Sequence, residues 1–405
     1  MQLVAGAAVV AVLVAAAMVL GGGRREAASG SAAAPVPAGP EQIARGAYLA
    51  TLGNCAGCHT RPGGEPYAGG RGLPTPYGTV YAGNLTPDDT TGLGRWSADD
   101  FWRALHEGRS RDGRRLVPAF PYTSFSHVVR DDSDALFAYL RSLPPVQRAN
   151  TPHGLRFPYN TELAMAAWQW LHFTPVDPAA SAARSRGAYL VQGLGHCAAC
   201  HAPRNALGAT SGELSGGQVA GQAWYAPSLH PAAGRGDAAE LAALLRDGRT
   251  DQDSLSGPMA SVVYRSLQHW HADDLQAVAD YLVNLPARPA TAETPPPAPA
   301  SDLALGRRLY DKRCADCHGE RGQGAAGAYP ALAGNPTVLQ PTARNLVQVM
   351  REGGFAPATA GHPRPYGMPP QDLSNAELAA IASYVRQSWG NRASAVSELQ
   401  VMQLR

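Results

Sequence analysis

The sequence predicts an all-α protein built from three tandem copies of one small helical domain, with long loops wrapped between the helices. One cysteine pattern occurs three times along the chain, and each copy lies between two segments with helical patterning. Glycine and proline are abundant, with 44 and 34 of the 405 residues. This composition favours short helices joined by long loops over a closely connected helical bundle.

All six cysteines belong to this pattern, which reads NCAGCH (54–59), HCAACH (196–201) and RCADCH (313–318). Cys-x-x-Cys-His is the attachment sequence of c-type haem. Two cysteines on one helical turn bind the vinyl groups, and the next residue, a histidine, provides a nitrogen ligand to the iron. The pattern therefore predicts three covalently bound haem c groups, each with its own residues: Cys55, Cys58 and His59; Cys197, Cys200 and His201; Cys314, Cys317 and His318.

Other uses of paired cysteines fit the pattern less well. A disulfide framework gives no reason for a histidine after every second cysteine. Zinc ribbons need two cysteine pairs close together for each metal, and these pairs are more than a hundred residues apart. A thioredoxin-like motif needs a βαβ context that the sequence does not show.

Helices are predicted on both sides of each motif. The first helix of each copy covers residues 45–53, 186–195 or 306–313, and the last covers 131–144, 273–286 or 374–390. Capping boxes mark the start of the helix at Ser374 and of an additional helix at Ser97. A helix before the haem motif and a later helix crossing it are typical of small cytochrome c domains.

The predicted organisation follows from these repeats and from changes in composition. It consists of an N-terminal membrane anchor or signal peptide (1–23), a linker (24–40), cytochrome c domain 1 (41–150), an ordered connector (151–180), cytochrome c domain 2 (181–288), a proline-rich linker (289–301), cytochrome c domain 3 (302–392) and a C-terminal tail (393–405).

The N-terminal segment from Leu3 to Gly23 carries no charge and is long enough to span a bilayer as a helix. A signal peptide usually has a shorter apolar core and a basic start, whereas Arg24 and Arg25 follow the apolar run here. The sequence leaves both interpretations open, and either one places the rest of the chain outside the cytoplasm.

Composition and motifs also exclude some functions. A formal net charge of +2 argues against electrostatic binding of nucleic acid. No glycine-rich nucleotide loop or hydrolase motif is present, so no residue is predicted to be catalytic.

Electron-transfer haems usually take a second axial ligand, methionine or histidine. Met259 follows a proline 58 residues after His201, and Met368 precedes two prolines 50 residues after His318. A methionine is often a core residue. The adjacent prolines, which stiffen a loop, and the position before the last helix favour iron ligation for both.

In the first domain the equivalent turn reads VPAFPY, and Phe120 stands 61 residues after His59 where the repeat predicts methionine. Phenylalanine cannot bind iron, so this haem is either open, water-bound or ligated by a histidine. The histidine candidates are His127, in TSFSHVVRDD, and His106, near the end of the helix that starts at Ser97.

Several segments together resemble the cytochrome c subunits of membrane-bound bacterial dehydrogenases. These segments are RGAYL before the first two motifs, GPM, SLQH, RFPYN with its following tryptophan, and YVRQSWGN near the end. The resemblance covers about residues 41–392. Phe120 departs from the family, in which many members have methionine in an AMPY turn.

The resemblance implies a triheme cytochrome that acts with a separate catalytic subunit of the alcohol, aldehyde, gluconate or fructose dehydrogenase type. That subunit would carry flavin, pyrroloquinoline quinone or molybdenum. The haems would pass electrons to membrane ubiquinone or another respiratory acceptor at the periplasmic face of the inner membrane. An alternative is a haem enzyme that acts on a small ligand such as peroxide at an open first haem.

Overall fold

The computed structural model describes residues 38–231, 237–250, 253–287 and 295–404. By its contacts the chain divides into two compact units, one reaching residue 199 and including 204–210, the other comprising 200–203 and 211–405. The division falls inside the second cysteine motif, so the three predicted domains stay a prediction. The expected anchor or signal peptide (1–23) lies outside the described residues. Within the described ranges, no helix is both long and apolar enough to cross a membrane.

The first unit is mainly helical and holds one small antiparallel sheet, β1-β2-β3. Its elements are α2 (Pro40–Leu52), α3 (Cys55–His59), β1 (Gly72–Thr75), β2 (Gly78–Tyr81), α4 (Ala98–Glu107), α5 (Tyr122–Phe125), α6 (Arg130–Ser142), β3 (Gly154–Leu155), α7 (Glu162–His172), α8 (Pro178–Ala182), α9 (Arg186–Tyr189) and η1 (Leu190–Leu194). Helix α10 (Ala198–His201) spans the point in the sequence where the units divide.

The second unit is also mainly helical, with two two-stranded antiparallel ribbons, β4-β5 and β6-β7. Its elements are β4 (Gly217–Gln218), β5 (Tyr225–Ala226), α11 (Ala238–Asp247), α12 (Gly257–Arg265), η2 (Leu267–His269), α13 (Ala272–Val283), α14 (Ala300–Arg313), α15 (Ala315–His318), α16 (Arg344–Glu352), β6 (Gly354–Phe355), β7 (Gly367–Met368), α17 (Asn375–Gln387) and α18 (Glu398–Gln403). The mainly helical class is as expected, and the short strands are additional.

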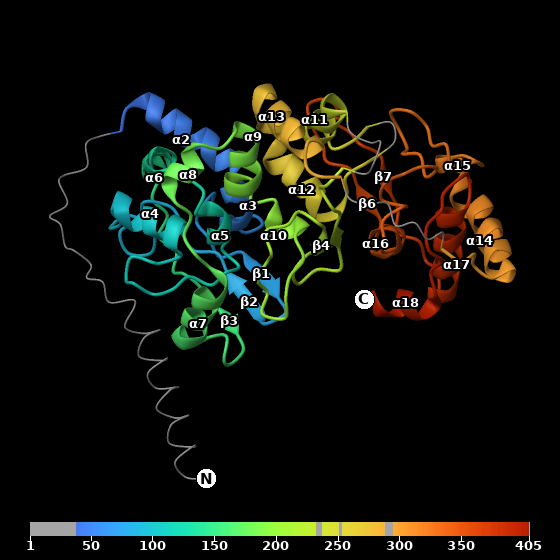
Figure 1. Cartoon of the computed structure of the whole chain (residues 1–405), viewed down its shortest axis with the longest axis horizontal. Helices are drawn as coiled ribbons and strands as arrows, with labels where there is room; N and C mark the ends of the chain where they lie inside the picture. The colour runs from blue at the N-terminus through green and yellow to red at the C-terminus, as the bar shows by residue number, and fades with distance from the viewer. Residues whose placement is uncertain (1–37, 232–236, 251–252, 288–294, 405) are drawn as a thin grey trace, which may run out of the picture. The chain divides into compact units, whose positions relative to one another are not determined.

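Helices α2 and α6 cross closely in the first unit (Figure 1). A Cβ at Gly46 of α2 would overlap the carbonyl oxygen of Ala135 and lie 2.7 Å from Cβ of Tyr139. Glycine is therefore required at the crossing, because only a residue without a side chain lets the two backbones approach this closely.

Asp132 of α6 connects two RGAYL segments that are far apart in the sequence. Its carboxylate is buried and accepts a 3.0 Å hydrogen bond from Nε of Arg45 and a 2.6 Å bond from the hydroxyl of Tyr189. Arg45 belongs to the first copy of the segment and Tyr189 to the second. The last helix of the first repeat is thus bonded to the first helices of two repeats.

The connector forms helix α7, which packs on the turn that contains Phe120. Gln169 of α7 donates a 3.2 Å hydrogen bond to the carbonyl of Gly108, and Glu162 forms a 2.8 Å ion pair with Arg115. The ring of Tyr122 lies edge-on to Trp168 of α7, with centroids 6.2 Å apart. Helix α7 thus contacts the VPAFPY turn and the residues on either side of it.

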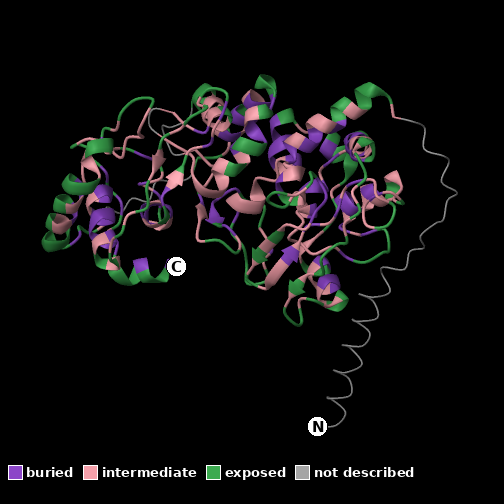
Figure 2. Ribbon diagram, turned by 180° about the vertical axis from the view of Figure 1, so that it is seen from behind, coloured by how far each residue is buried: buried purple, intermediate pink, exposed green. Residues whose placement is uncertain are grey.

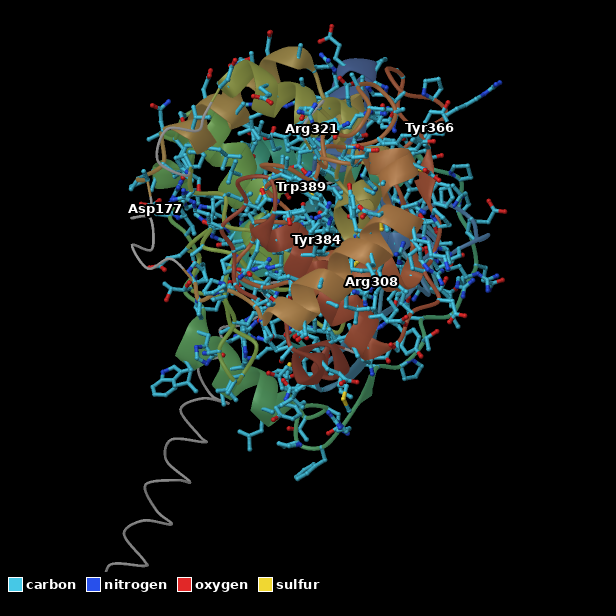
Figure 3. The ribbon with its side chains drawn as sticks, turned by 90° about the vertical axis from the view of Figure 1, so that its right-hand side faces the viewer. Asp177, Arg308, Arg321, Tyr366, Tyr384 and Trp389 are labelled. Atoms are coloured by element: carbon cyan, nitrogen blue, oxygen red, sulfur yellow. The ribbon has the colours of Figure 1, made fainter. Side chains whose placement is uncertain are left out.

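Helix α14 crosses α17 in the second unit in the way that α2 crosses α6. A Cβ at Gly306 would overlap the carbonyl oxygen of Ala380 and lie 2.7 Å from Cβ of Tyr384. Figure 2 shows buried positions concentrated on α17 and exposed positions on the outer turns of α14. Tyr310, Tyr384 and Trp389 form an aromatic cluster with centroid distances of 4.9–5.6 Å, and Figure 3 labels two of them.

Both predicted capping boxes are present. The side chain of Ser97 accepts from the backbone N–H of Asp100, and that of Ser374 accepts from Glu377, while each acidic side chain bonds back to the cap. These bonds satisfy backbone donors that have no partner within the helix. They fix the starts of α4 and α17 at the residues that the sequence indicates.

One local feature of the second repeat differs from a plain helix. RGAYLVQGLG has one residue more before its motif than RGAYLATLG. The structure accommodates the extra residue as a π-helical turn, η1, which continues α9. Single π-helical turns of this kind occur within α-helices and are frequent at functional sites.

Candidate haem-binding sites

Each cysteine motif ends in a short helical turn, α3, α10 or α15, which carries the motif histidine at its last position. The cysteines and the histidine of a motif thus come from one turn or the residues just before it. This is the local geometry that covalent attachment of a haem and ligation of its iron require.

The three motif histidines make the same hydrogen bond. Nδ1 of His59 lies 2.7 Å from the carbonyl oxygen of Gly83, Nδ1 of His201 lies 2.7 Å from that of Pro227, and Nδ1 of His318 lies 3.0 Å from that of Pro330. A carbonyl only accepts, so each Nδ1 carries the proton and each Nε2 keeps its lone pair. A histidine oriented in this way is prepared to bind a metal through Nε2.

Burial keeps these imidazoles neutral. Loss of solvent lowers the pKa of all three residues, His59, His201 and His318. The hydrogen bond to the carbonyl raises the pKa, but by less. A neutral ring is the form that binds iron.

All six cysteines are free thiols in the described residues. Burial raises the pKa of Cys55 to about 12 and that of Cys314 to about 11. Catalytic and metal-binding cysteines instead have lowered pKa values that favour the thiolate. The sulfurs of Cys55 and Cys314 therefore suit the neutral thioether bonds of haem c, and together with the motif histidines they fit that group.

No three His, Cys, Asp or Glu side chains in the described ranges come together so that they could hold a metal ion by themselves. Each motif histidine would instead serve as a nitrogen ligand to a haem iron, whose other nitrogen donors the porphyrin would supply.

Tyrosines accompany the attachment cysteines in the first and third repeats. Tyr67 stands edge-on to Tyr139, with centroids 5.9 Å apart, and its pKa is raised by burial and by the neighbouring Cys55. Tyr310 donates a 2.6 Å hydrogen bond to the carbonyl of Gly319. Burial raises the pKa of Tyr310, and the neighbouring Cys314 raises it further.

The two candidate methionine ligands are half-buried. Met259 lies in the first turn of α12, directly after Pro258. Met368 ends β7, opposite Gly354 of β6, and packs against the core of the second unit. The sulfur ligation predicted for both stays a prediction.

Phe120 is half-buried among aromatic side chains. Its ring centroid lies 5.3 Å from that of Phe125 and 6.4 Å from that of Tyr122. Its environment is that of a packing residue, which agrees with the chemistry of its side chain.

The two histidine candidates for the first iron each have a buried Nδ1 without a hydrogen-bond partner. His106 stacks on Trp102 with a centroid distance of 4.5 Å. His127 lies near Gly193 of η1. A Cβ added at Gly193 would be 3.3 Å from the Cβ of His127. Burial, then Arg184 and His106, lower the pKa of His127 to about 4. Burial thus favours the neutral form of both rings, and ligation of the first iron by His127 stays a prediction.

Sequence reasoning missed His196, the residue before Cys197. Its Nε2 lies 3.3 Å from the carbonyl oxygen of Gly53, just before the first motif. The signal available was its place in the motif, where the other copies have Asn54 and Arg313.

The fold and these sites define a c-type cytochrome, and the family model described as Cytochrome c matches residues 303–389. The cytochrome c subunit of alcohol dehydrogenase (quinone) from Komagataeibacter europaeus is 38% identical over 394 residues, which cover 90% of this chain and 84% of that protein. The gluconate 2-dehydrogenase cytochrome c subunit of Pantoea cypripedii is 36% identical over 382 residues, covering 87% of each.

A nicotinate dehydrogenase component of Pseudomonas putida is 41% identical over 364 residues, covering 85% of this chain but 30% of that protein. The chain belongs to the family of cytochrome c subunits of bacterial alcohol, gluconate and fructose dehydrogenases. It therefore binds haem c and takes part in electron transfer.

Proposed function

We propose that the chain carries three haem c groups in three consecutive domains and relays electrons from a dehydrogenase catalytic subunit to ubiquinone or another respiratory acceptor. The observation that carries the proposal is the identical bond from Nδ1 of His59, His201 and His318 to a backbone carbonyl. Three motifs that share this orientation are each suited to hold an iron.

The protein itself contributes to this function by holding each haem in place within an apolar environment. Haem c supplies one-electron chemistry when bound. The carbonyl partners fix each imidazole ring, which prevents rotation away from the iron. The aromatic cluster of Tyr310, Tyr384 and Trp389 belongs to the same apolar core as Cys314 of the third attachment site. Met259 and Met368 would each hold a haem iron through the side-chain sulfur, at the second and third sites respectively.

The proposed partner and location follow the family. Relatives bear the names of alcohol, gluconate, fructose and nicotinate dehydrogenase subunits, so a catalytic subunit of such a complex is the proposed electron donor. We place the complex at the periplasmic face of the inner membrane, where ubiquinone is accessible. Copurification from native membranes, with mass spectrometry of the associated chains, identifies the partner and its cofactor.

The test has two parts. Pyridine haemochrome and intact mass should give three haems per chain, and Cys314→Ser/Cys317→Ser should give two. The purified chain should not be reduced by alcohols, aldehydes or sugars alone, and should be reduced when the copurifying catalytic subunit and its substrate are added. Reduction by substrate without that subunit contradicts the carrier function.

A second candidate function is small-ligand chemistry, such as peroxide reduction, at an open first haem. It is favoured by Phe120, which has no donor atom, together with the unpartnered Nδ1 atoms of His106 and His127. A carbon monoxide difference spectrum of the reduced protein distinguishes the two. Binding at one haem in three supports an open iron, whereas no binding supports a histidine ligand, with His127 the first residue to replace.

A further inference from the structure

The first and second cysteine motifs begin beside each other within the first unit. Gly53 precedes Asn54 and Cys55, and His196 precedes Cys197. Nε2 of His196 lies 3.3 Å from the carbonyl oxygen of Gly53. The carbonyl only accepts, so Nε2 carries the proton and donates it. The segments that precede Cys55 and Cys197 are thus joined by one hydrogen bond, between residues that are 143 positions apart in the sequence.

Both motif starts have the same unusual backbone conformation. Asn54 has φ of 47° and His196 has φ of 37°, in the left-handed region that few residues with a side chain adopt. Turn hydrogen bonds hold each of them, from Asn54 N to Thr51 O at 3.0 Å and from His196 N to Gly193 O at 2.9 Å. Each motif therefore starts from a defined turn rather than from a flexible loop.

Side-chain packing closes the same junction. A Cβ at Gly53 would lie 3.2 Å from Sγ of Cys55 and 3.7 Å from Cδ2 of Leu194, so the first attachment sulfur and η1 both border this glycine. The ring of Phe125 stands edge-on to His196, with centroids 5.5 Å apart. The imidazole is therefore held between an aromatic ring and a carbonyl, and its position is fixed on two sides.

We propose that His196 is a positioning residue that holds the Cys55 and Cys197 attachment points together, so that the first and second haems exchange electrons directly. This inference rests on the proposed function, because it needs a haem at both motifs. In the exchange, one electron leaves one iron and enters the other, with no bond formed or broken and no proton transferred. The third motif starts with Arg313 at the end of α14 and has no equivalent arrangement within the described residues.

The test uses the full-length haem-loaded protein and the circular dichroism of its Soret band. Two haems held close together in a fixed orientation give a paired positive and negative signal, which reports their arrangement independently of any enzyme activity. The wild type should show this pair. Removing the second haem with Cys197→Ser/Cys200→Ser should abolish it, and removing the third with Cys314→Ser/Cys317→Ser should leave it.

Two amide substitutions isolate the role of His196. His196→Asn tolerates the left-handed backbone but is too short to reach the Gly53 carbonyl, whereas His196→Gln places an N–H near the original position. We expect His196→Asn to reduce the population of the bonded arrangement about fivefold, the effect of losing one ordinary hydrogen bond, and to diminish the paired signal. His196→Gln should restore it, and Arg313→Gln is the matched control in the third motif.

The outcomes separate this inference from the function on which it rests. Fewer than three haems in the wild type contradict the proposed function. Three haems with no paired signal, or a pair that depends on the third haem, overturn the role of His196. A pair that persists unchanged in His196→Asn also overturns it. If His196→Asn attaches fewer haems, the two cysteine-pair variants alone still decide whether the first and second haems are adjacent.

Discussion

The first and third repeats share the same helix crossing, but the arginine that follows it is exposed in the first repeat and buried in the third. In both, a glycine of the first helix meets the last helix six residues before an arginine that donates to loop carbonyls. Arg386 in the third repeat is 1% exposed and donates to the carbonyls of Val338 and Gln340 at 2.7 and 3.0 Å. Arg141 in the first repeat is exposed and donates to the carbonyls of Leu93 and Gly94.

The difference lies in what covers the crossing. The chain after α17 folds back over it, and Arg386 also bonds to the carbonyl and hydroxyl of Ser394 at 2.8 and 3.0 Å. Burial lowers the pKa of Arg386 to about 10, so it is still charged at neutral pH. The same helical motif thus becomes a surface site in one repeat and a buried polar network in the other, depending on the segment that follows it.

The largest effect should come from the two crossing glycines. We expect Gly46→Ala and Gly306→Ala each to destabilise its own repeat by about 3 kcal/mol or more, because a methyl group would overlap a backbone carbonyl in a packed crossing. Thermal unfolding at the Soret band and hydrogen exchange of peptides from α6 and α17 measure this. Gly39→Ala is the control, since its Cβ would meet nothing within 4 Å. Equal stability of Gly39→Ala and Gly46→Ala would show that the close helix crossing does not require glycine.

The two arginines should then differ in importance. We expect Arg386→Met to cost about 2 kcal/mol, because it leaves several buried carbonyls without a donor. Arg141→Met should change stability by less than about 0.5 kcal/mol, as exposed substitutions usually do. Hydrogen exchange around Val338 and around Leu93 measures each loop directly. Similar protection losses in both variants would mean that burial does not distinguish the repeats.

The reduction potentials should also differ between the repeats. Methionine ligation and apolar burial raise the potential of a haem, and the first repeat has Phe120 where the others have Met259 and Met368. We expect the first haem to titrate at the lowest potential of the three. A potentiometric titration of the wild type and of Phe120→Met measures this, and the substitution should raise one potential only. A first haem with the highest potential contradicts the ligand assignment.

The smallest effect should be a dependence on acid that is confined to the first repeat. His127 has a pKa of about 4 against its ordinary value of 6.5, so the unfolded chain binds the proton more readily than the folded one. Its contribution to stability is therefore complete above pH 6.5 and is lost as the pH falls toward 4. Thermal unfolding between these values should show a smaller loss for His127→Gln. Identical pH profiles for the two proteins would show that His127 is not the responsible group.

The sequence predicts the parts of this molecule that depend on local chemistry. Capping boxes at Ser97 and Ser374 form because their bonds link residues three positions apart. The mainly helical class and the helical turns that carry the cysteine motifs also follow from short-range patterns.

The rest depends on contacts between distant residues. Nothing in the order of residues indicates that Asp132 would bond Tyr189, or that His196 would reach Gly53. The π-helical turn η1 was visible only as one additional residue between RGAYL and its motif. A single sequence shows such an insertion but not whether a loop or a helix absorbs it, because packing of the surrounding helices decides that.

The bonds of the motif histidines differ in how much chain they enclose. They span 24 residues at His59, 26 at His201 and 12 at His318. Halving a loop lowers the entropic cost of closing it by about 0.6 kcal/mol. The third pocket should therefore assemble most readily when the chain folds, even though it is synthesised last.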